Sequence, residues 1–277
     1  MSRGLVYEIS AAGAASVVAE PGGNPTGLAE DQAGRVWIAQ GGGHSRTSSK
    51  CAVGPGIQCL RGAEVIDVLG TGLDAPNDCA VDRDGAVWFT DPRGSALGRS
   101  GPPGRVLRLD PDAGEVSVLA EGIHYPNGLA FAPGGGVLYV AETRSSRILR
   151  FEVAGDWLVG REVFATLAGA HPDGLAIDRE GRLFVAAPPA AAVFVLGADG
   201  STLEVLRLAP GSLPTNLCFG GPAMSTLFVT AAKGGRVLRL ELGVRGLELP
   251  SRHTSSRVVN VSVDKPPRIL YGVNRPF

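Results

Sequence analysis

Apolar residues along this chain fall in short runs and alternating stretches, with a turn rich in Gly, Asp or Pro after about every 8–12 residues. The stretch after Pro172 is representative. It reads GLAID, RLFVAA, AVFVLGA and LEVLRLA, with turns at residues 179–181 and 199–200. Helical periodicity is absent, and Gly and Pro stand where they would interrupt a helix. Four strands in about 42 residues predict a four-stranded antiparallel meander, which is typical of one blade of a β-propeller.

A phrase recurs at the start of each predicted blade: Pro, a polar residue, a small residue and then an apolar strand. It begins at Pro25, Pro76, Pro126, Pro172 and, in a looser copy, Pro214, at spacings of 51, 50, 46 and 42 residues. The polar position holds Thr26, Asn77, Asn127, Asp173 and Thr215. Because the first strand of each blade lines the channel of a propeller, we expect these side chains to converge at one mouth of it. Loop 40–62 is the longest at that face and is a candidate lid.

The two ends of the sequence each carry half of a further repeat. VVNVSVD and RILYGVN near the C-terminus resemble first and second strands, with Val259 at the polar position, and RGLVYEIS and ASVVAE resemble third and fourth strands. We therefore predict that residues 1–277 form a single all-β domain, a six-bladed β-propeller with four-stranded antiparallel blades, whose ring is closed by strands from both termini.

Composition narrows the classes of function. The chain is 44% hydrophobic with 40 Gly and 20 Pro, so it can bury a core and is rich in turns. A formal net charge of −1 gives no reason to expect nucleic acid or an anionic membrane as a partner. Apolar runs are shorter than a membrane span, and the N-terminus lacks the pattern of a signal peptide. A cytoplasmic protein acting on a small molecule is the expectation.

The four Cys residues do not form the pattern of a disulfide scaffold. Cys79 and Cys218 lie inside predicted strands and are expected to be small buried residues. Cys51 and Cys59 flank a loop rich in Gly and Pro, and both a disulfide between them and two separate thiols agree with the sequence.

Three consecutive blades place Asn77, Asn127 and Asp173 at the polar position. Amide and carboxylate oxygens of this kind suit Ca²⁺ or another hard divalent cation. Asn and Asp before a small residue are also good turn formers, so the same residues can be explained by backbone geometry. Their recurrence after Pro at equivalent points of three blades favours the first interpretation, a metal or substrate site.

Three segments resemble one known family: GLDAPNDCAVDRDGAVWFTD, YPNGLAFAPGGGVLYVAET and HPDGLAIDREGRLFVA are similar to motifs of senescence marker protein (regucalcin), gluconolactonase and luciferin-regenerating enzyme. The resemblance implies a six-bladed propeller that hydrolyses lactones at one divalent metal, Ca²⁺ most often, with Zn²⁺ or Mg²⁺ as alternatives. It also implies that Asn77, Asn127 and Asp173 are metal ligands, and that Asp173 is the catalytic base or acid.

The sequence departs from this family at two positions. Thr26 stands where the family carries a Glu ligand, and Ala75 stands where some sugar lactonases carry Arg. Loss of one carboxylate weakens the attraction for a divalent cation by several kcal/mol, on the order expected for a partly dry site. We therefore expect a weakly bound metal or none.

Other candidate residues lie in loops at the same face. His171 and His124 are candidates for proton transfer. Thr26, His44, Tyr125 and Thr215 are candidates for contacts with the substrate. Arg93, Arg144 and Lys233 either meet an acidic substrate or are solvated at the surface. For Asp78 and Asn216 we expect a role in fixing backbone turns.

Three functions follow in order of preference. The first is a metal-dependent lactonase-like hydrolase that opens a lactone or related ester. The second is a biosynthetic isomerase, cyclase or lyase on the same scaffold, which uses Asp173 and a His. The third is a propeller that binds a small molecule without catalysis. The oligomeric state does not follow from the sequence, and fold alone does not choose among these functions.

Overall fold

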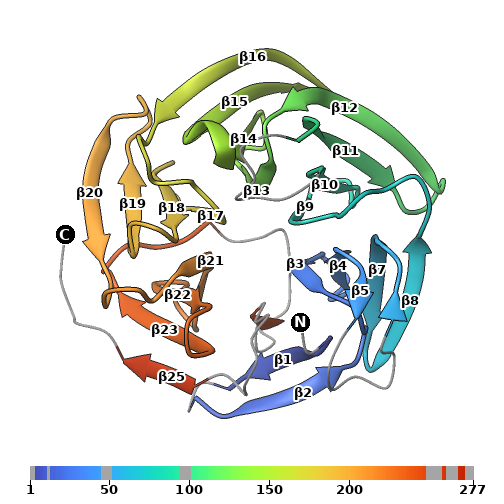
Figure 1. The fold of residues 1–277 in the computed structure, drawn as a ribbon, viewed down its shortest axis with the longest axis horizontal. Coiled ribbons are helices and arrows are strands. Elements are labelled where there is room, and N and C mark those ends of the chain that lie inside the picture. Colours follow the sequence, from blue (N-terminus) through green and yellow to red (C-terminus); the bar gives the residue numbers. More distant parts are fainter. Residues whose placement is uncertain are drawn as a thin grey trace.

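The strands form sheets arranged in a ring (Figure 1). The structure is a computed structural model that describes residues 4–10, 13–44, 52–93, 101–247, 258–259 and 268–271. One short 3₁₀ helix, η1 (Thr143–Ser145), is the single helical element in these ranges. Within these ranges no helix has the length and apolar character needed to cross a membrane. The predicted all-β propeller is confirmed.

Five sheets have four strands each, and every one begins with a copy of the recurring phrase. The first contains β3 (Pro25–Glu30), β4 (Val36–Gln40), β7 (Gly56–Arg61) and β8 (Glu64–Leu69). The second contains β9 (Cys79–Val81), β10 (Val87–Asp91), β11 (Gly104–Asp110) and β12 (Glu115–Ile123). The third contains β13 (Pro126–Phe131), β14 (Val137–Glu142), β15 (Arg147–Ala154) and β16 (Trp157–Thr166). The fourth contains β17 (Leu175–Ile177), β18 (Leu183–Ala187), β19 (Ala192–Leu196) and β20 (Thr202–Arg207). The fifth contains β21 (Pro214–Gly220), β22 (Thr226–Ala231), β23 (Arg236–Glu241) and β25 (Arg268–Tyr271).

The predicted count of six four-stranded blades is wrong, since the described residues form five. A further sheet has three strands, β2 (Ala15–Ala19), β1 (Val6–Ile9) and β24 (Val258–Val259), and β1 pairs with β24 antiparallel. The prediction assigned the RILY segment to this sheet, but the structure places it as β25 against β23, in a parallel pair. Within the described residues the fifth blade has three strands from its own repeat, and β25 supplies hydrogen-bond partners to the outer edge of β23.

The predicted loop 40–62 also needs correction. Its second half contains β7, which pairs with β4 as the third strand of the first blade. In the first half β5 (Gly43–His44) pairs with β6 (Ala52–Val53), and residues 45–51 lie outside the described residues. The lid assigned to this segment therefore remains a prediction.

Carboxylates shape the turn between the first and second strands of a blade. Asp31 accepts the backbone N–H groups of Ala33 and Arg35, and its other oxygen accepts the indole N–H of Trp37 at 3.0 Å. Asp82 of the second blade accepts the indole N–H of Trp88 in the same way, at 2.8 Å. In these first two blades the Asp and Trp thus tie the turn to the core beside it.

The apolar faces of neighbouring blades pack against each other. Between the first and second blades, Trp37, Cys59, Cys79, Phe89 and Leu107 belong to one buried cluster. The expectation for Cys79 is confirmed, whereas Cys218 is only partly buried. Burial raises the pKa of the Cys59 thiol, and its proposed partner Cys51 lies outside the described residues.

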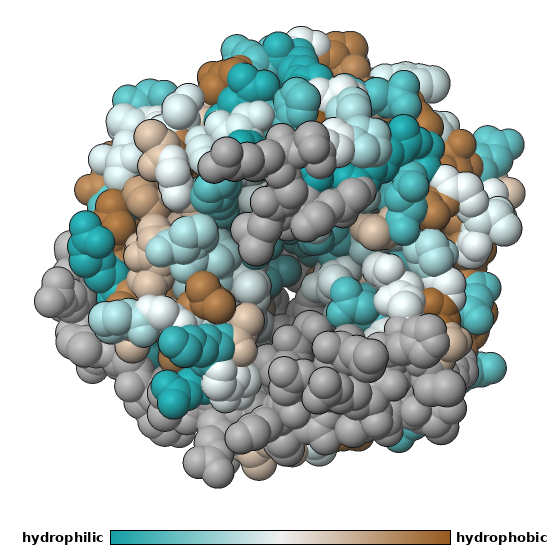
Figure 2. Space-filling view, in the orientation of Figure 1, coloured by the Kyte–Doolittle hydropathy of each residue, from teal (hydrophilic) through white to brown (hydrophobic). Residues whose placement is uncertain are grey.

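The first strands of the blades lie nearest the centre of the ring (Figure 1). They approach each other so closely that several positions accept only Gly. A Cβ on Gly128 would lie 2.5 Å from the carbonyl oxygen of Asp173, and one on Gly174 would lie 2.6 Å from the Cα of Asn216. The space-filling view shows a small opening near the centre of the ring, and the coloured residues beside it are mostly teal to white (Figure 2). Gly27, Gly128 and Gly174, which follow three of the polar positions, therefore allow the first strands of neighbouring blades to lie close together.

Candidate functional site

The polar positions of the second, third and fourth blades meet at the start of their first strands. Asn77 and Asp173 come just before β9 and β17, and Asn127 is the second residue of β13. The side chain of Asn127 hydrogen-bonds to Asp173. The side chain of Asn77 hydrogen-bonds to Tyr125. Burial raises the pKa of the same phenol, and the charge of Asp173 raises it further. These four residues therefore form one cluster, which we call the mouth cluster.

Asp173 is the acidic member of the mouth cluster. Enclosure by the surrounding protein raises its pKa well above the ordinary carboxyl range, and the nearby charge of Asp78 raises it further. The hydrogen bond from Asn127 acts in the opposite direction and is the weaker influence. The side chain nevertheless remains partly exposed. A carboxyl whose pKa is raised in this way is a candidate for exchanging a proton with a bound molecule.

Asp78 is a second carboxyl in this region, and burial raises its pKa to about 7. It accepts the backbone N–H of Cys79, and it hydrogen-bonds to the side chain of Asn216 from the fifth blade. The oxygen of the Asn216 side chain also accepts the backbone N–H of Leu217, at 2.8 Å. The predicted role of these two residues in fixing the backbone is confirmed, but their contact across the ring was missed. The available signal was that Asp78 stands where Gly27, Gly128 and Gly174 stand in other blades.

Thr143 fixes the orientation of the Asn127 amide. The Thr143 hydroxyl donates its proton to the carbonyl oxygen of Pro172 at 2.7 Å, so it can only accept from Asn127. The atom of Asn127 at 3.2 Å is therefore the amide nitrogen Nδ2, because only the nitrogen carries protons. Thr143 thus links the third blade to the fourth and determines which side of the Asn127 amide faces it.

The two predicted proton-transfer histidines have different surroundings. His171 is partly buried, and its Nδ1 lies 3.1 Å from the carbonyl oxygen of Thr143. His124 is exposed, and its backbone N–H donates to the buried carboxylate of Glu142 at 2.8 Å. The geometry therefore brings His171 next to the residues around Asp173 and leaves the His124 side chain at the surface.

Three residues that immediately precede the Pro of the recurring phrase have left-handed backbones. The φ angles are 63° at Tyr125, 47° at His171 and 54° at Leu213. A non-glycine residue rarely adopts this conformation, and strain of this kind is concentrated at functional sites. The third, fourth and fifth blades thus share an unusual backbone at the same point of the repeat.

The predicted substrate contacts lie at equivalent points of other blades. The hydroxyl oxygen of Thr26 lies 3.1 Å from the carbonyl oxygen of Ala39 and 3.0 Å from that of Pro76, so its single proton is shared between these two acceptors. The hydroxyl of Thr215 shares a hydrogen bond with Thr230 at 2.9 Å. His44 lies in β5, and its side chain is outside the described part of the structure. Thr26 therefore binds neutral backbone groups.

The chemistry of the mouth cluster fits a hard cation only weakly. Among the described residues, His, Cys, Asp and Glu nowhere form a group of three or more that could hold a metal ion. The available oxygens are one carboxylate, from Asp173, and the amide oxygens of Asn77 and Asn127. Such ligands are of the type that Ca²⁺ accepts, but they carry little charge. A cation bound here would also favour the ionised form of Asp173.

Comparison with known proteins gives a consistent result. A family model described as the SMP-30/gluconolactonase/LRE-like region matches residues 63–233. A gluconolactonase of Zymomonas mobilis is 31% identical over 231 residues, which are 77% of this chain and 62% of that protein. A 6-deoxy-6-sulfogluconolactonase of Pseudomonas putida is 33% identical over 168 residues, covering 58% of this chain and 55% of that protein. The chain thus spans less than two thirds of the length of these two relatives.

Solved structures agree on the fold. A gluconolactonase from Xanthomonas campestris superposes with a TM-score of 0.69 at 28% identity, covering 83% of this chain and 76% of that one. A calcium-binding protein, regucalcin, from Agrobacterium tumefaciens superposes with a TM-score of 0.67 at 24% identity, covering 82% and 75%. The second likeness is one of fold alone.

Proposed function

Because the chain belongs to the SMP-30/gluconolactonase/LRE-like family, we propose that it hydrolyses a lactone or related ester at the mouth cluster. The relatives named as lactonases support this class of reaction. The proposal depends on one observation, the surroundings of Asp173. Its side chain is partly exposed and hydrogen-bonded to Asn127, and the surrounding protein raises the pKa of its carboxyl group.

The proposed reaction needs one group that moves a proton. Asp173 accepts a proton from the attacking water as the new C–O bond forms at the lactone carbonyl. When the ring C–O bond breaks, the proton passes to the departing alkoxide. A carboxyl with a raised pKa suits both steps, because it holds a proton more readily than an ordinary carboxyl and can release it to the alkoxide.

The amide side chains have a supporting role in this proposal. Thr143 fixes the amide of Asn127, and Asn127 in turn holds Asp173. Tyr125 joins Asn77 to the same group and, with Thr26, Thr215 and His44, is proposed to contact the substrate. His171 is the better placed of the two histidines for a second proton transfer.

We propose Asn77, Asn127 and Asp173 as the residues that would hold a divalent cation, with Ca²⁺ the best match and Zn²⁺ or Mg²⁺ as alternatives. When bound, the cation would polarise the lactone carbonyl. With Thr26 bonded to backbone carbonyls instead of supplying charge, the affinity should be low.

A second function is favoured by the low charge of this site. Asp173 and His171 could carry out an isomerisation, cyclisation or elimination that needs proton transfer without a strongly bound metal. The third candidate function is the binding of a small molecule without catalysis. Localisation in the cytoplasm also stays a proposal.

The pairing of β24 with β1 supports the proposal that strands from both ends of the sequence close the ring. Removal of residues 248–277 should then lower the melting temperature, because both β24 and β25 are lost. An unchanged melting temperature would contradict this.

The proposed reaction is tested with a panel of lactones, with Ca²⁺ added or removed by a chelator. We expect Asp173→Asn to lower kcat/KM by about 10²–10⁴-fold, the usual range for a general acid–base. Asp199→Asn, at an exposed turn, is the matched control and should leave the rate unchanged. Hydrolysis that survives in Asp173→Asn would contradict the assignment. Absence of hydrolysis for every lactone would favour the second or third function.

A further inference from the structure

Tyr125 is held in place by its backbone. It immediately precedes Pro126, the first residue of β13, and its φ angle is 63°. Its carbonyl oxygen accepts the backbone N–H of Thr143 at 3.1 Å, and the carbonyl oxygen of His124 accepts that of Arg144 at 3.2 Å. The 3₁₀ turn η1 therefore fixes the loop that carries Tyr125, in a conformation that a non-glycine residue rarely adopts.

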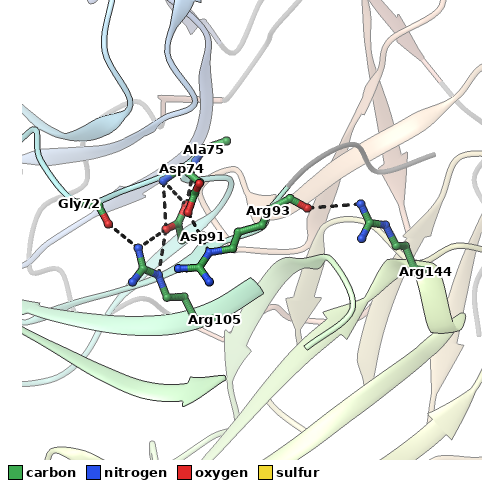
Figure 3. Close-up of polar contacts among 7 residues, drawn as sticks. All are labelled: Gly72, Asp74, Ala75, Asp91, Arg93, Arg105 and Arg144. Atoms are coloured by element: carbon green, nitrogen blue, oxygen red, sulfur yellow. Dashed lines mark hydrogen bonds and ion pairs between the residues drawn. The ribbon is translucent and has the colours of Figure 1, made fainter. Parts of the chain in front are cut away.

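The ring of Tyr125 lies against a guanidinium that is itself anchored. The Cζ of Arg144 is 5.4 Å from the centroid of this ring, a distance at which a cation and an aromatic face attract each other. Nη2 of Arg144 donates to the carbonyl oxygen of Arg93 at 3.3 Å, and its Nη1 lies 3.5 Å from that of Gly101 (Figure 3). The Arg144 side chain is thus committed to these groups, and it fixes the Tyr125 ring.

Asn77, the hydrogen-bond partner of Tyr125, also lies on a fixed segment. The fully buried carboxylate of Asp91 accepts the backbone N–H of Ala75, two residues before Asn77, at 2.8 Å (Figure 3). Arg105 binds the same carboxylate at 2.9 Å. The contact between Tyr125 and Asn77 therefore joins two segments whose backbones are each held by other groups.

The phenol of Tyr125 has a proton to donate. The bond from Asn77 acts to lower its pKa, as a hydrogen bond donated to the phenol oxygen does, so the Asn77 amide nitrogen is the donor. Asp173 acts on the phenol through its charge. In the described part of the structure the phenol O–H donates to no protein group. Because the Tyr125 side chain is partly exposed, this O–H is available to a bound molecule.

We propose that Tyr125 is a further catalytic residue, whose phenol O–H donates a hydrogen bond to the carbonyl oxygen of the lactone as negative charge develops there. This rests on the proposed lactone hydrolysis. As water adds to the carbonyl carbon, Asp173 takes a proton from the water, and the π electrons of the C=O bond move to the carbonyl oxygen. When these electrons form the C=O bond again, the ring C–O bond breaks and the departing oxygen takes the proton from Asp173. Tyr125 keeps its own proton throughout.

The fixed position of Tyr125 suits this role. A donor that is already in place stabilises developing charge without reorganising during the reaction. Arg144 and η1 supply this preorganisation, and the bond from Asn77 occupies the phenol oxygen while leaving its proton for the substrate. Tyr125 would thus stabilise the charge on the lactone oxygen, while Asp173 would move the proton.

Replacement of the phenol by a phenyl ring tests this by rate. Tyr125→Phe removes the O–H and keeps the ring against Arg144, so a role that is only structural would be retained. We expect kcat for glucono-1,5-lactone to fall by about 10²–10³-fold, the usual loss for one oxyanion donor, with KM changed by less than about twofold. Tyr139→Phe makes the same chemical change in β14, where the phenol is bonded to Arg150, and should leave both constants unchanged. An unchanged kcat in Tyr125→Phe, or an equal loss in Tyr139→Phe, would overturn the proposal.

A binding measurement separates the donor from the reaction. Calorimetric titration compares two inhibitors at one Ca²⁺ concentration: glucono-1,5-lactam, which keeps a planar carbonyl, and the cyclic phosphonate of the same ring, whose anionic tetrahedral oxygens resemble the addition intermediate. Tyr125→Phe should weaken the phosphonate by about the factor lost in kcat/KM and should spare the lactam, because a catalytic donor acts on the developing charge. Equal losses for the two inhibitors would count against the donor.

The rate and binding results together distinguish the two proposals. Binding of the phosphonate that depends on Tyr125, without hydrolysis of any lactone, supports the donor and overturns only the proposed reaction. Hydrolysis that Tyr125→Phe leaves intact, with unchanged binding of the phosphonate, overturns only the donor. Absence of both hydrolysis and phosphonate binding overturns both.

Discussion

The Asn127 side chain donates a hydrogen bond to the Thr143 hydroxyl at 3.2 Å, and Thr143 is itself committed to the carbonyl of Pro172. Asn127 is buried, with 5% of its surface exposed, so its amide cannot exchange this partner for water without cost. Because Asn127 also bonds to Asp173, the position of the acidic group depends on a hydroxyl that does not belong to the recurring phrase.

Replacement of Thr143 tests this dependence. Thr143→Val keeps the shape but removes the donor to the Pro172 carbonyl and the acceptor for one N–H of the Asn127 amide, at a cost of about 1–3 kcal/mol for each buried group. We expect kcat/KM to fall by about tenfold or more, together with a shift in the pH profile, because Asn127 no longer holds Asp173. Thr143→Ser retains the hydroxyl and should restore both. Equal losses in the Ser and Val variants would show that the hydroxyl is not the cause.

The close approach of the first strands predicts a strong effect of a single methyl group. Gly128→Ala would place a Cβ 2.5 Å from the carbonyl oxygen of Asp173, so the third and fourth blades must separate locally. We expect a loss of about 1–3 kcal/mol in the free energy of unfolding. The melting temperature should fall by roughly 2–4 °C for each kcal/mol, and activity should fall as well. Gly136→Ala is the matched control, because nothing lies within 4 Å of its Cβ. Similar melting temperatures for both variants would contradict the packing argument.

The sequence predicted the repeat and the convergence of Asn77, Asn127 and Asp173, because both follow from local or periodic signals. Each phrase contains its own turn and strand signals, and the period places Asn77, Asn127 and Asp173 at equivalent points. It did not predict the place of β25, because a parallel pair at a blade edge leaves no turn signal between its two strands.

The contact between Asp78 and Asn216 was missed for a related reason. Each residue looks like a turn former in its own segment, and only the closed ring brings the second and fifth blades together at this point. The contact of Arg144 with Tyr125 is similarly invisible, because it depends on how η1 folds back onto the preceding loop.

The raised pKa of Asp78 predicts how stability depends on pH. In the unfolded chain this carboxyl ionises near pH 4, with a pKa of about 3.9, whereas in the folded protein its pKa is about 7. The stabilisation is therefore complete below about pH 4 and is lost as the pH rises toward 7, by up to roughly 4 kcal/mol in the free energy of unfolding. Asp173, also raised, acts in the same direction.

The test is urea unfolding of metal-free protein between pH 4 and 8. Asp78→Asn should flatten the decline of the unfolding free energy, because the residue no longer ionises in either state. Asp199→Asn changes an exposed carboxyl whose pKa is lowered by Ser201, so it should leave the slope in this range unchanged. A decline of the same steepness in Asp78→Asn would refute the assignment.

The two histidines should differ in their effect on catalysis. His171→Gln removes a partly buried ring whose Nδ1 lies 3.1 Å from the Thr143 carbonyl, so we expect kcat to fall by about tenfold or more. His124→Gln changes an exposed side chain and keeps the backbone bond to Glu142, so kcat should change by less than about twofold. Steady-state kinetics on the best lactone would decide this, and a larger loss in His124→Gln would reverse the roles.

Thr26 gives the most direct control over cation binding. Its hydroxyl is bonded to the Pro76 carbonyl, directly before Asn77, so a carboxylate introduced at this position would add negative charge beside the proposed ligands. We expect Thr26→Glu to tighten Ca²⁺ binding by about tenfold or more. It should do so at a cost of about 1 kcal/mol in stability without Ca²⁺, because the hydroxyl's hydrogen bonds are lost. Calorimetric Ca²⁺ titration, together with the melting temperature at rising Ca²⁺ concentration, measures both effects. Thr26→Gln has the same size without the charge and should lose stability without gaining affinity. Equal affinity for Ca²⁺ in the Glu and Gln variants would mean that position 26 does not face the cation. It would contradict the placement of the cation between Thr26 and the proposed ligands Asn77, Asn127 and Asp173.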